Sequence, residues 1–185
     1  MLFRSATQGK QTRVEAVLGA TDRVDLQWTP RVKRVADMEA TIFCDNSVLI
    51  SIGGGVIRTH AVLDYHISQG ELRQAKIRLP AGHRLLRVAA TGIRTWEFFA
   101  EGANELVVVD LTKGVANEWQ LRVETEKPLP TLPAALKLEV PHAADVKREN
   151  GLVAVRGGDE LSVFVDGAPT LQRIDNAEFT RRTTF

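Results

Sequence analysis

Hydrophobic and polar residues alternate along most of this chain with a period of two. The pattern is clear in three runs, WQLRVET, LKLEV and MEATIFC, at residues 119–125, 136–140 and 38–44. Such alternation is typical of a strand with one buried face and one solvated face, because successive side chains point to opposite sides. The sequence therefore predicts a protein made mainly of β-strands.

Turn signals separate these runs at short intervals. They are Asp45–Asn46, Gln69–Gly70, Lys113–Gly114, Asn150–Gly151 and Asp166–Gly167. The last two are the strongest hairpin signals, because Asn-Gly and Asp-Gly supply the two positive φ angles of a type I′ turn. Two stretches, TRVEAVLGA and RVKRVADMEA, also have helical spacing, but their β-branched residues favour strands.

Many short strands with frequent turns predict an all-β fold, namely an antiparallel two-sheet β-sandwich of roughly a dozen strands. We expect residues 1–185 to form a single β-sandwich domain excised from a longer multi-domain protein. The proline-rich stretch KPLPTLP cannot lie in a central strand and predicts a crossing connection. A subdivision of the domain near residues 127–134 is the alternative.

The composition is that of an ordinary globular protein. Of the 185 residues, 44% are hydrophobic and 25% are charged, and the formal net charge is +1. These values argue against disorder and give no long-range attraction toward nucleic acid or a membrane surface. No apolar run approaches the roughly 20 residues that cross a bilayer, so we expect no direct membrane insertion by this segment.

There is one cysteine, Cys44, so an intrachain disulfide is excluded and cysteine usage assigns no compartment. Cys44 alternates onto the same face as Ile42, which predicts a small buried hydrophobe and not a reactive thiolate. The first residues carry no apolar signal-peptide core. We expect an envelope or periplasmic location if the parent chain carries a signal peptide.

Three consecutive glycines, Gly53 to Gly55, interrupt a long extended run. A phosphate-binding loop requires glycines at set spacing before a helix, whereas the residues that follow alternate as a strand. We therefore expect a bulge or a sharp bend within a long strand, because glycine tolerates the backbone angles that bulges use.

Asp64 and His66 are the candidates for metal binding or catalysis, since they lie two residues apart on the predicted solvent face of a strand. His60 shares that face but lies about 20 Å from His66 in an extended chain. A zinc site needs three or four ligands, so His83 or His142 would have to complete it. The sequence has no cysteine pair, HExxH motif or serine nucleophile elbow. We expect polar residues on a solvated strand face, with no metal site, no cofactor and no catalytic residue.

Charge changes sign along the middle of the chain. Residues 72–94 include six basic residues and no acid, whereas residues 95–126 include seven acids and two bases. Opposite charges in neighbouring segments predict cross-strand ion pairs between solvated faces. The alternative is an anion-binding surface, in which Arg84 and Arg87 contact a ligand.

Aromatic residues raise the question of a stacking platform for carbohydrate. Trp28 and Trp119 alternate with aliphatic residues, so we expect both in the core. Alternation does not decide the burial of Trp96, because Phe98 shares its side and Phe99 lies on the other. Trp96 is therefore the candidate contact for a polysaccharide. A single exposed ring does not by itself make a carbohydrate-binding platform.

In LDYHISQGELRQAKIRLPAGHRLLRVAATGIRTWEF, a strand, a glycine turn and an LP-x-G segment precede a V-x-x-x-G-x-x-x-W segment. This order of segments resembles that of a family of large β-rich, envelope-associated proteins of planctomycete and verrucomicrobial bacteria. ELVVVDLTKGVANEWQLRVETEKPL and VKRENGLVAVRGGDELSVFVDGAPTLQRIDNAEF resemble the continuation of the same unit. The resemblance covers residues 36–179 and implies a fold and an envelope location. It implies no reaction and no catalytic residue.

These observations favour a non-catalytic structural or interaction module of a larger bacterial protein, which contacts neighbouring domains or proteins through exposed strands or loops. The alternative is a binding module for carbohydrate or another cell-surface polymer, with contacts at Trp96, Arg84 and Arg87. A hydrolase-type enzyme is the third hypothesis, with Asp64 and His66 as the pair to test.

Overall fold

The computed structural model describes residues 2–8, 11–17, 20, 23, 25, 39–101, 104–131, 135–166, 171–183 and 185. The chain divides into two compact units, Met1–Val32 and Lys33–Phe185, and the alternative boundary near residues 127–134 falls inside the second. In the first unit, β1 (Leu2–Gln8) and β2 (Gln11–Val17) form an antiparallel hairpin. The strand expected for TRVEAVLGA is confirmed by β2, whereas Trp28 and residues 31–38 lie outside the described residues.

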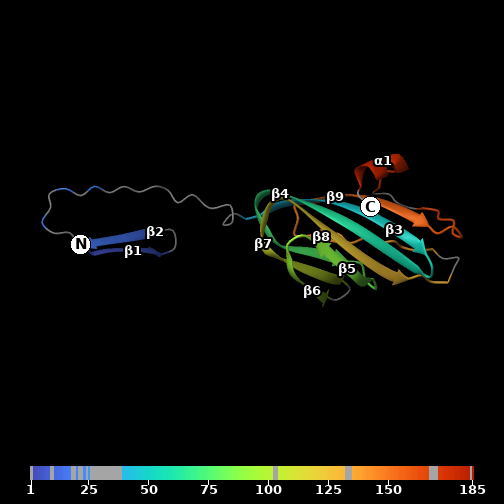
Figure 1. The fold of residues 1–185 in the computed structure, drawn as a ribbon, viewed down its shortest axis with the longest axis horizontal. Coiled ribbons are helices and arrows are strands. Elements are labelled where there is room, and N and C mark those ends of the chain that lie inside the picture. Colours follow the sequence, from blue (N-terminus) through green and yellow to red (C-terminus); the bar gives the residue numbers. More distant parts are fainter. Residues whose placement is uncertain are drawn as a thin grey trace. The chain divides into compact units, whose positions relative to one another are not determined.

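The second unit is built on one seven-stranded sheet, and its described residues include one short helix, α1 (Asn176–Arg182) (Figure 1). The strands are β3 (Thr41–Gly53), β4 (Val56–Leu79), β5 (Arg84–Ala90), β6 (Ile93–Glu101), β7 (Asn104–Pro128), β8 (His142–Ala144) and β9 (Arg148–Gly157). Their order is β5-β7-β4-β3-β9, with β6 also paired to β7 and β8 also paired to β4. The expected all-β class is confirmed for the described residues. None of their helices is long and apolar enough to cross a membrane.

One expectation about the sheet was wrong, and a second is not confirmed. The sheet is mixed and not purely antiparallel, because β9 runs parallel to β3. The described residues also form nine strands instead of roughly a dozen, because some turn signals lie inside long strands. Gln69–Gly70 lies inside the 24-residue strand β4, where Gly70 has a φ of 73° and the pairing with β7 shifts register. The chain therefore bulges at Gly70 and continues as a strand.

Asn150–Gly151 is a close approach between strands and not the expected hairpin turn. It lies within β9, where Gly151 pairs with Asn46 of β3. A Cβ atom on Gly151 would lie 2.7 Å from the backbone oxygen of Asn46, so a larger residue would force the strands apart. The real hairpin turn is Gly54–Gly55, with φ angles of 59° and 77°, which joins β3 to β4. The glycine triplet is thus a turn between two strands and not a bend within one.

The alternation defines the buried face of the sheet as expected. On β4, Ala61, Leu63, Tyr65 and Ile67 are all buried. They belong to one hydrophobic cluster that includes residues from both ends of β4 and β7. Trp119 is a core residue, as expected, and its ring lies 5.5 Å from that of Tyr65 between centroids. One side of the sheet therefore carries the hydrophobic core.

Cys44 is buried in the same core, at 1% exposure. Burial raises the pKa of its thiol, with smaller contributions from Glu149 and other nearby carboxylates, so the thiol stays protonated at neutral pH. The interpretation of Cys44 as a buried hydrophobe is confirmed.

The run LKLEV also packs in alternation, with Leu136 and Leu138 against the core, but it forms no strand.

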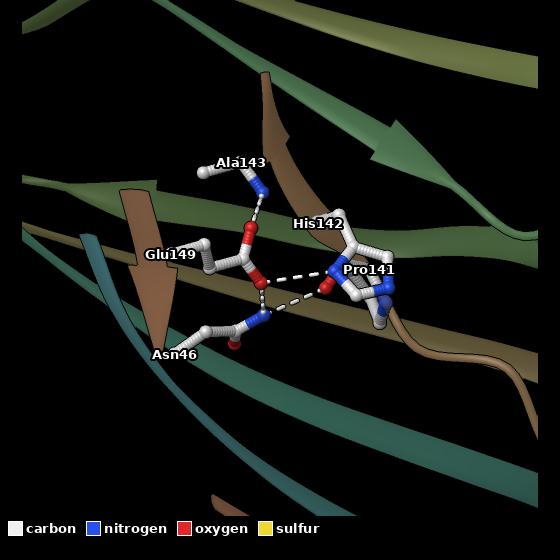
Figure 2. A network of polar contacts seen from close by, with 5 residues as sticks. All are labelled: Asn46, Pro141, His142, Ala143 and Glu149. Carbon is white, nitrogen blue, oxygen red and sulfur yellow. Dashed lines mark hydrogen bonds and ion pairs between the residues drawn. The ribbon is translucent and has the colours of Figure 1, made fainter. Parts of the chain in front are cut away.

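A partly buried polar network ties β3, β8 and β9 together (Figure 2). The side-chain amide of Asn46 donates to the backbone oxygen of Pro141 at 2.7 Å and to Glu149 Oε1 at 2.9 Å. The Ala143 amide donates to Glu149 Oε2 at 2.7 Å, and His142 Nδ1 lies 2.9 Å from Glu149 Oε1. Burial alone would raise the pKa of Glu149, but the hydrogen bonds from His142 and Asn46 hold it below its ordinary value. We call these residues the Glu149 network.

Candidate functional site

The arginines of β5 are engaged by carboxylates of the neighbouring strand. Arg84 pairs with Glu126, and Arg87 Nη1 lies 3.7 Å from Glu124 Oε1, so each guanidinium faces an acid of β7. Arg94 of β6 lies 3.4 Å from Asp110 in the same way. The expected cross-strand ion pairs are confirmed at these three positions. Arg84 and Arg87 remain largely exposed, but their charge is offset locally, which weakens the case for an anion site there.

Asp64 and His66 line a groove of about 710 Å³ on the solvated face of the sheet. His66 lies between two acids, with Nε2 3.3 Å from Asp45 Oδ2 and Nδ1 3.8 Å from Glu118 Oε1. Asp64 accepts a hydrogen bond from Gln120 at 2.8 Å. The structure therefore places the two residues side by side, as the strand spacing predicted.

The groove does not gather the ligands that a metal site needs. Among the residues that the structure describes, no group of three or more His, Cys, Asp or Glu side chains is arranged to hold a metal ion. The two histidines that would have to join Asp64 and His66 lie elsewhere. His83 is buried against Thr125, and His142 belongs to the Glu149 network. The groove is a polar surface in which carboxylates hold one exposed histidine.

Trp96 lies on β6 at the edge of the sheet and is 44% exposed. Two neighbours on the same strand, Phe98 and Phe99, are 44% and 46% exposed. We call Trp96, Phe98 and Phe99 the β6 edge surface. Isolated apolar residues are ordinary on protein surfaces, but several large ones grouped on one edge are typical of a contact surface.

The pairing of β6 with β7 explains why these aromatic residues are exposed. Trp96 pairs with Val109 and Phe98 pairs with Val107, and both valines are completely buried. Paired residues of an antiparallel ladder point to the same face. Trp96 and Phe98 therefore extend the hydrophobic face of the sheet beyond the part that the core covers. Phe99 pairs with Leu106 on the opposite face, so β6 is apolar on both sides.

One long side of β6 is a free sheet edge. Among the described strands, β6 pairs only with β7. Alternate residues of β6 therefore direct their backbone N–H and C=O groups away from β7, where no strand pairs with them. The run TWEFF includes a single charged residue, Glu97, to discourage pairing with another strand. A strand with a free edge and apolar side chains can accept an additional strand by backbone hydrogen bonding.

Sequence reasoning singled out Trp96 but gave too little weight to its neighbours. The signal was the run RTWEFF, in which aromatic residues occupy both alternating positions of one strand. A central strand of this sheet hides such residues on one side only, so aromatic residues on both sides indicate an edge strand.

No protein-family model and no curated protein matches this sequence. Among solved structures, the chain is similar to the M1 zinc metallopeptidase of Deinococcus radiodurans, with a TM-score of 0.34 and 17% identity over 51% of this chain and 22% of the peptidase. A mutant of that enzyme bound to a Tyr-Ser-Ala substrate gives a TM-score of 0.37 and 15% identity over 54% of this chain and 24% of the peptidase. A two-domain M1 zinc metallopeptidase mutant bound to L-tryptophan gives a TM-score of 0.36 and 15% identity over 51% of this chain and 23% of the peptidase. The chain thus matches less than a quarter of each enzyme, and likenesses this low assign it no activity.

Proposed function

We propose that this chain is a non-catalytic interaction module of a larger bacterial protein, and that it contacts a neighbouring domain or a protein partner through the β6 edge surface. The observation that carries the proposal is the exposure of Trp96, Phe98 and Phe99 on a strand with a free edge. The resemblance to envelope-associated multi-domain proteins supports the same role and an envelope location.

The long strands suit such a role if one sheet folds over on itself into two layers, which is what we infer. β4 and β7 pair along most of their lengths, and their register shifts near Gly70 allow a bend between two halves. The buried residues of both halves form one cluster, and helix α1 contributes no buried residue to cover them. We infer that the two halves cover each other as the layers of a β-sandwich, which leaves the outer strands as docking edges.

The aromatic side chains of the β6 edge surface offer exposed apolar area to a partner. An aromatic side chain has about 150–250 Å² of surface to bury, so covering the exposed 44% of Trp96 removes about 100 Å² from water. At about 25 cal/mol per Å², this contributes about 2.5 kcal/mol, and Phe98 and Phe99 contribute somewhat less each. Backbone hydrogen bonds along the free edge would add direction and register.

Site-directed photo-cross-linking in the producing cell tests this proposal. A benzophenone amino acid in place of Phe98 should give a discrete adduct with one protein or with one neighbouring domain, and Trp96→Ser should diminish it. The matched control is the same probe in place of Val153, which is 38% exposed on β9 at the opposite edge of the sheet. Equal adducts at both positions, or no adduct at position 98, would contradict the proposal.

Binding of carbohydrate or another cell-surface polymer is the second candidate, because Trp96 is exposed enough for a sugar ring to stack on it. Its neighbour on the same face is Phe98, and the nearby arginines are paired with acids, so the polar groups that orient a sugar are scarce. A glycan array on which the chain binds tightly, and Trp96→Ser does not, would favour this candidate over protein docking.

A further inference from the structure

The buried face of the sheet becomes polar toward the turn between β3 and β4. Three successive cross-strand pairs of β4 and β7 point to this face. They are Ala61–Val123, then Thr59–Thr125, then Ile57–Lys127. An all-apolar core would continue with aliphatic residues, whereas here two threonines and a lysine end the row. The row of core residues therefore ends in polar side chains near this turn.

A cavity of about 510 Å³ lies at this end of the sheet. Most of its wall is apolar and comes from Ile50, Ile57, Leu129, Leu136 and Leu138. Its size is within the range of small-molecule sites, roughly 300–1,000 Å³, and such sites are commonly apolar with a few placed polar groups. The cavity is separate from the β6 edge surface and shares no residue with it.

Thr59 supplies an unpaired hydroxyl group in this wall. The side chain is 1% exposed, and its Oγ1 atom has no hydrogen-bond partner among the described residues. Buried polar atoms are nearly always paired, so an orphan in a cavity wall indicates a missing acceptor or donor. The adjacent Thr125 is satisfied, because its Oγ1 lies 3.1 Å from His83 Nδ1. Burial lowers the pKa of His83, so the ring is neutral at neutral pH and can share hydrogen bonds without adding charge.

Two lysines and one glutamate line the cavity, so the described residues of its wall carry one more cation than anions. Lys137 and Glu139 form an ion pair at 2.6 Å. Lys127 forms no such close pair among the described residues, but it lies near enough to Glu139 to help lower the pKa of that carboxyl group. Thr59 and Lys127 are diagonal neighbours on one face, and diagonal positions are about 7–8 Å apart, within reach of a long side chain. The ammonium and the hydroxyl can therefore donate to the same small anionic group.

We propose that this cavity binds a small amphipathic carboxylate, with its carboxylate held by Lys127 and Thr59 and its hydrocarbon body against Ile57, Leu136 and Leu138. The positive charge at the polar end selects an anion, and the apolar wall selects a hydrocarbon chain or ring. A site of this kind gives the module a small-molecule ligand in addition to its docking edge.

Titration of the full chain with decanoate, followed by calorimetry and by thermal unfolding, tests the proposal. Decanoate should bind saturably and raise the melting temperature, whereas decanol and decylamine should bind at least about tenfold more weakly, because neither supplies the anion. Lys127→Met keeps the length of the side chain, removes the charge and should weaken decanoate binding about tenfold or more. Lys113→Met is the matched control, since this exposed lysine of β7 lies outside the cavity, and it should bind like the unmodified chain.

Thr59→Val provides a second variant that conserves shape and removes the unpaired hydroxyl. It should fold as stably as the unmodified chain and bind decanoate several-fold more weakly. Equal affinity in Lys127→Met and Lys113→Met, or equal affinity for decanoate, decanol and decylamine, would overturn the proposal. Cross-linking at position 98 does not depend on this cavity, so failure here leaves the proposed docking function to its own test.

Discussion

The Glu149 network makes a quantitative prediction about stability. Glu149→Gln keeps the size of the side chain but removes the charge that accepts from Asn46, His142 and the Ala143 amide. A hydrogen bond to a charged group contributes roughly 1.5–3 kcal/mol and a neutral one roughly 0.5–1.5, so each weakened bond costs about 1 kcal/mol. The His142 side chain is 58% exposed, and its share is reduced by solvent screening. We expect Glu149→Gln to lower the free energy of unfolding by about 2 kcal/mol.

The pH dependence of this loss identifies its cause. The hydrogen bonds of Glu149 lower its pKa in the folded chain. Its contribution to the free energy of unfolding is therefore fully present above the ordinary pKa of 4.5, and it is lost as the pH falls through the lowered pKa. The pKa of His142 is raised by Glu149, so its contribution is present below the ordinary value of 6.5 and is lost as pH rises through the raised value. The difference between the unmodified chain and Glu149→Gln should therefore be largest between about pH 4.5 and 6.5.

Urea unfolding followed by tryptophan fluorescence measures this difference, because Trp119 is buried in the same unit. Unfolding curves recorded from pH 4 to pH 8 give the free energy at each pH by linear extrapolation. Glu160→Gln, at an exposed turn, is the matched control and should change stability by less than about 0.5 kcal/mol. A loss that is equal for both variants, or that does not vary with pH, would refute the role assigned to the network.

Three further predictions follow from particular contacts. Gly151→Ala should lower stability by about 1–3 kcal/mol, measured by urea unfolding, because its Cβ would press on the Asn46 backbone; an unchanged midpoint would show that β3 and β9 move apart freely. Leu121→Ala should cost about 2–5 kcal/mol in the same assay, because Leu121 is completely buried; a cost below 1 kcal/mol would contradict its place in the core. Trp96→Ser combined with Phe98→Ser should leave the chain folded and raise its solubility, but should lower its melting temperature clearly, because somewhat more than half of each ring is buried; an unchanged melting temperature would mean that neither ring packs against the sheet.

The sequence predicted those features that depend on neighbouring residues. Period-two alternation correctly placed Leu63 and Tyr65 inside and Asp64 outside, because side-chain direction along a strand is a local property. The sign change of charge correctly predicted ion pairs such as Arg87–Glu124, because the two segments are adjacent strands of one sheet.

The sequence did not predict features that depend on which distant segments meet. The parallel pairing of β3 with β9 brings Asn46 within 2.9 Å of Glu149, although 103 residues separate them along the chain. The same pairing turned an apparent hairpin signal at Gly151 into a point of close approach. Local patterns contain no information about such partners, so the Glu149 network and the length of β4 were missed. The cavity beside Lys127 was missed for the same reason, since its walls come from both sides of the proline-rich connection.

Hydrogen–deuterium exchange of β6 is the most direct test of the docking account. In the free chain, amides of residues 93–101 that donate to β7 should exchange slowly, and those that point to the free edge should exchange rapidly. Addition of the partner captured at position 98 should slow the second set and leave β9 at the opposite edge unchanged. Outward amides that are already protected in the free chain, or that stay fast with the partner bound, would contradict the claim that this edge is where the module docks.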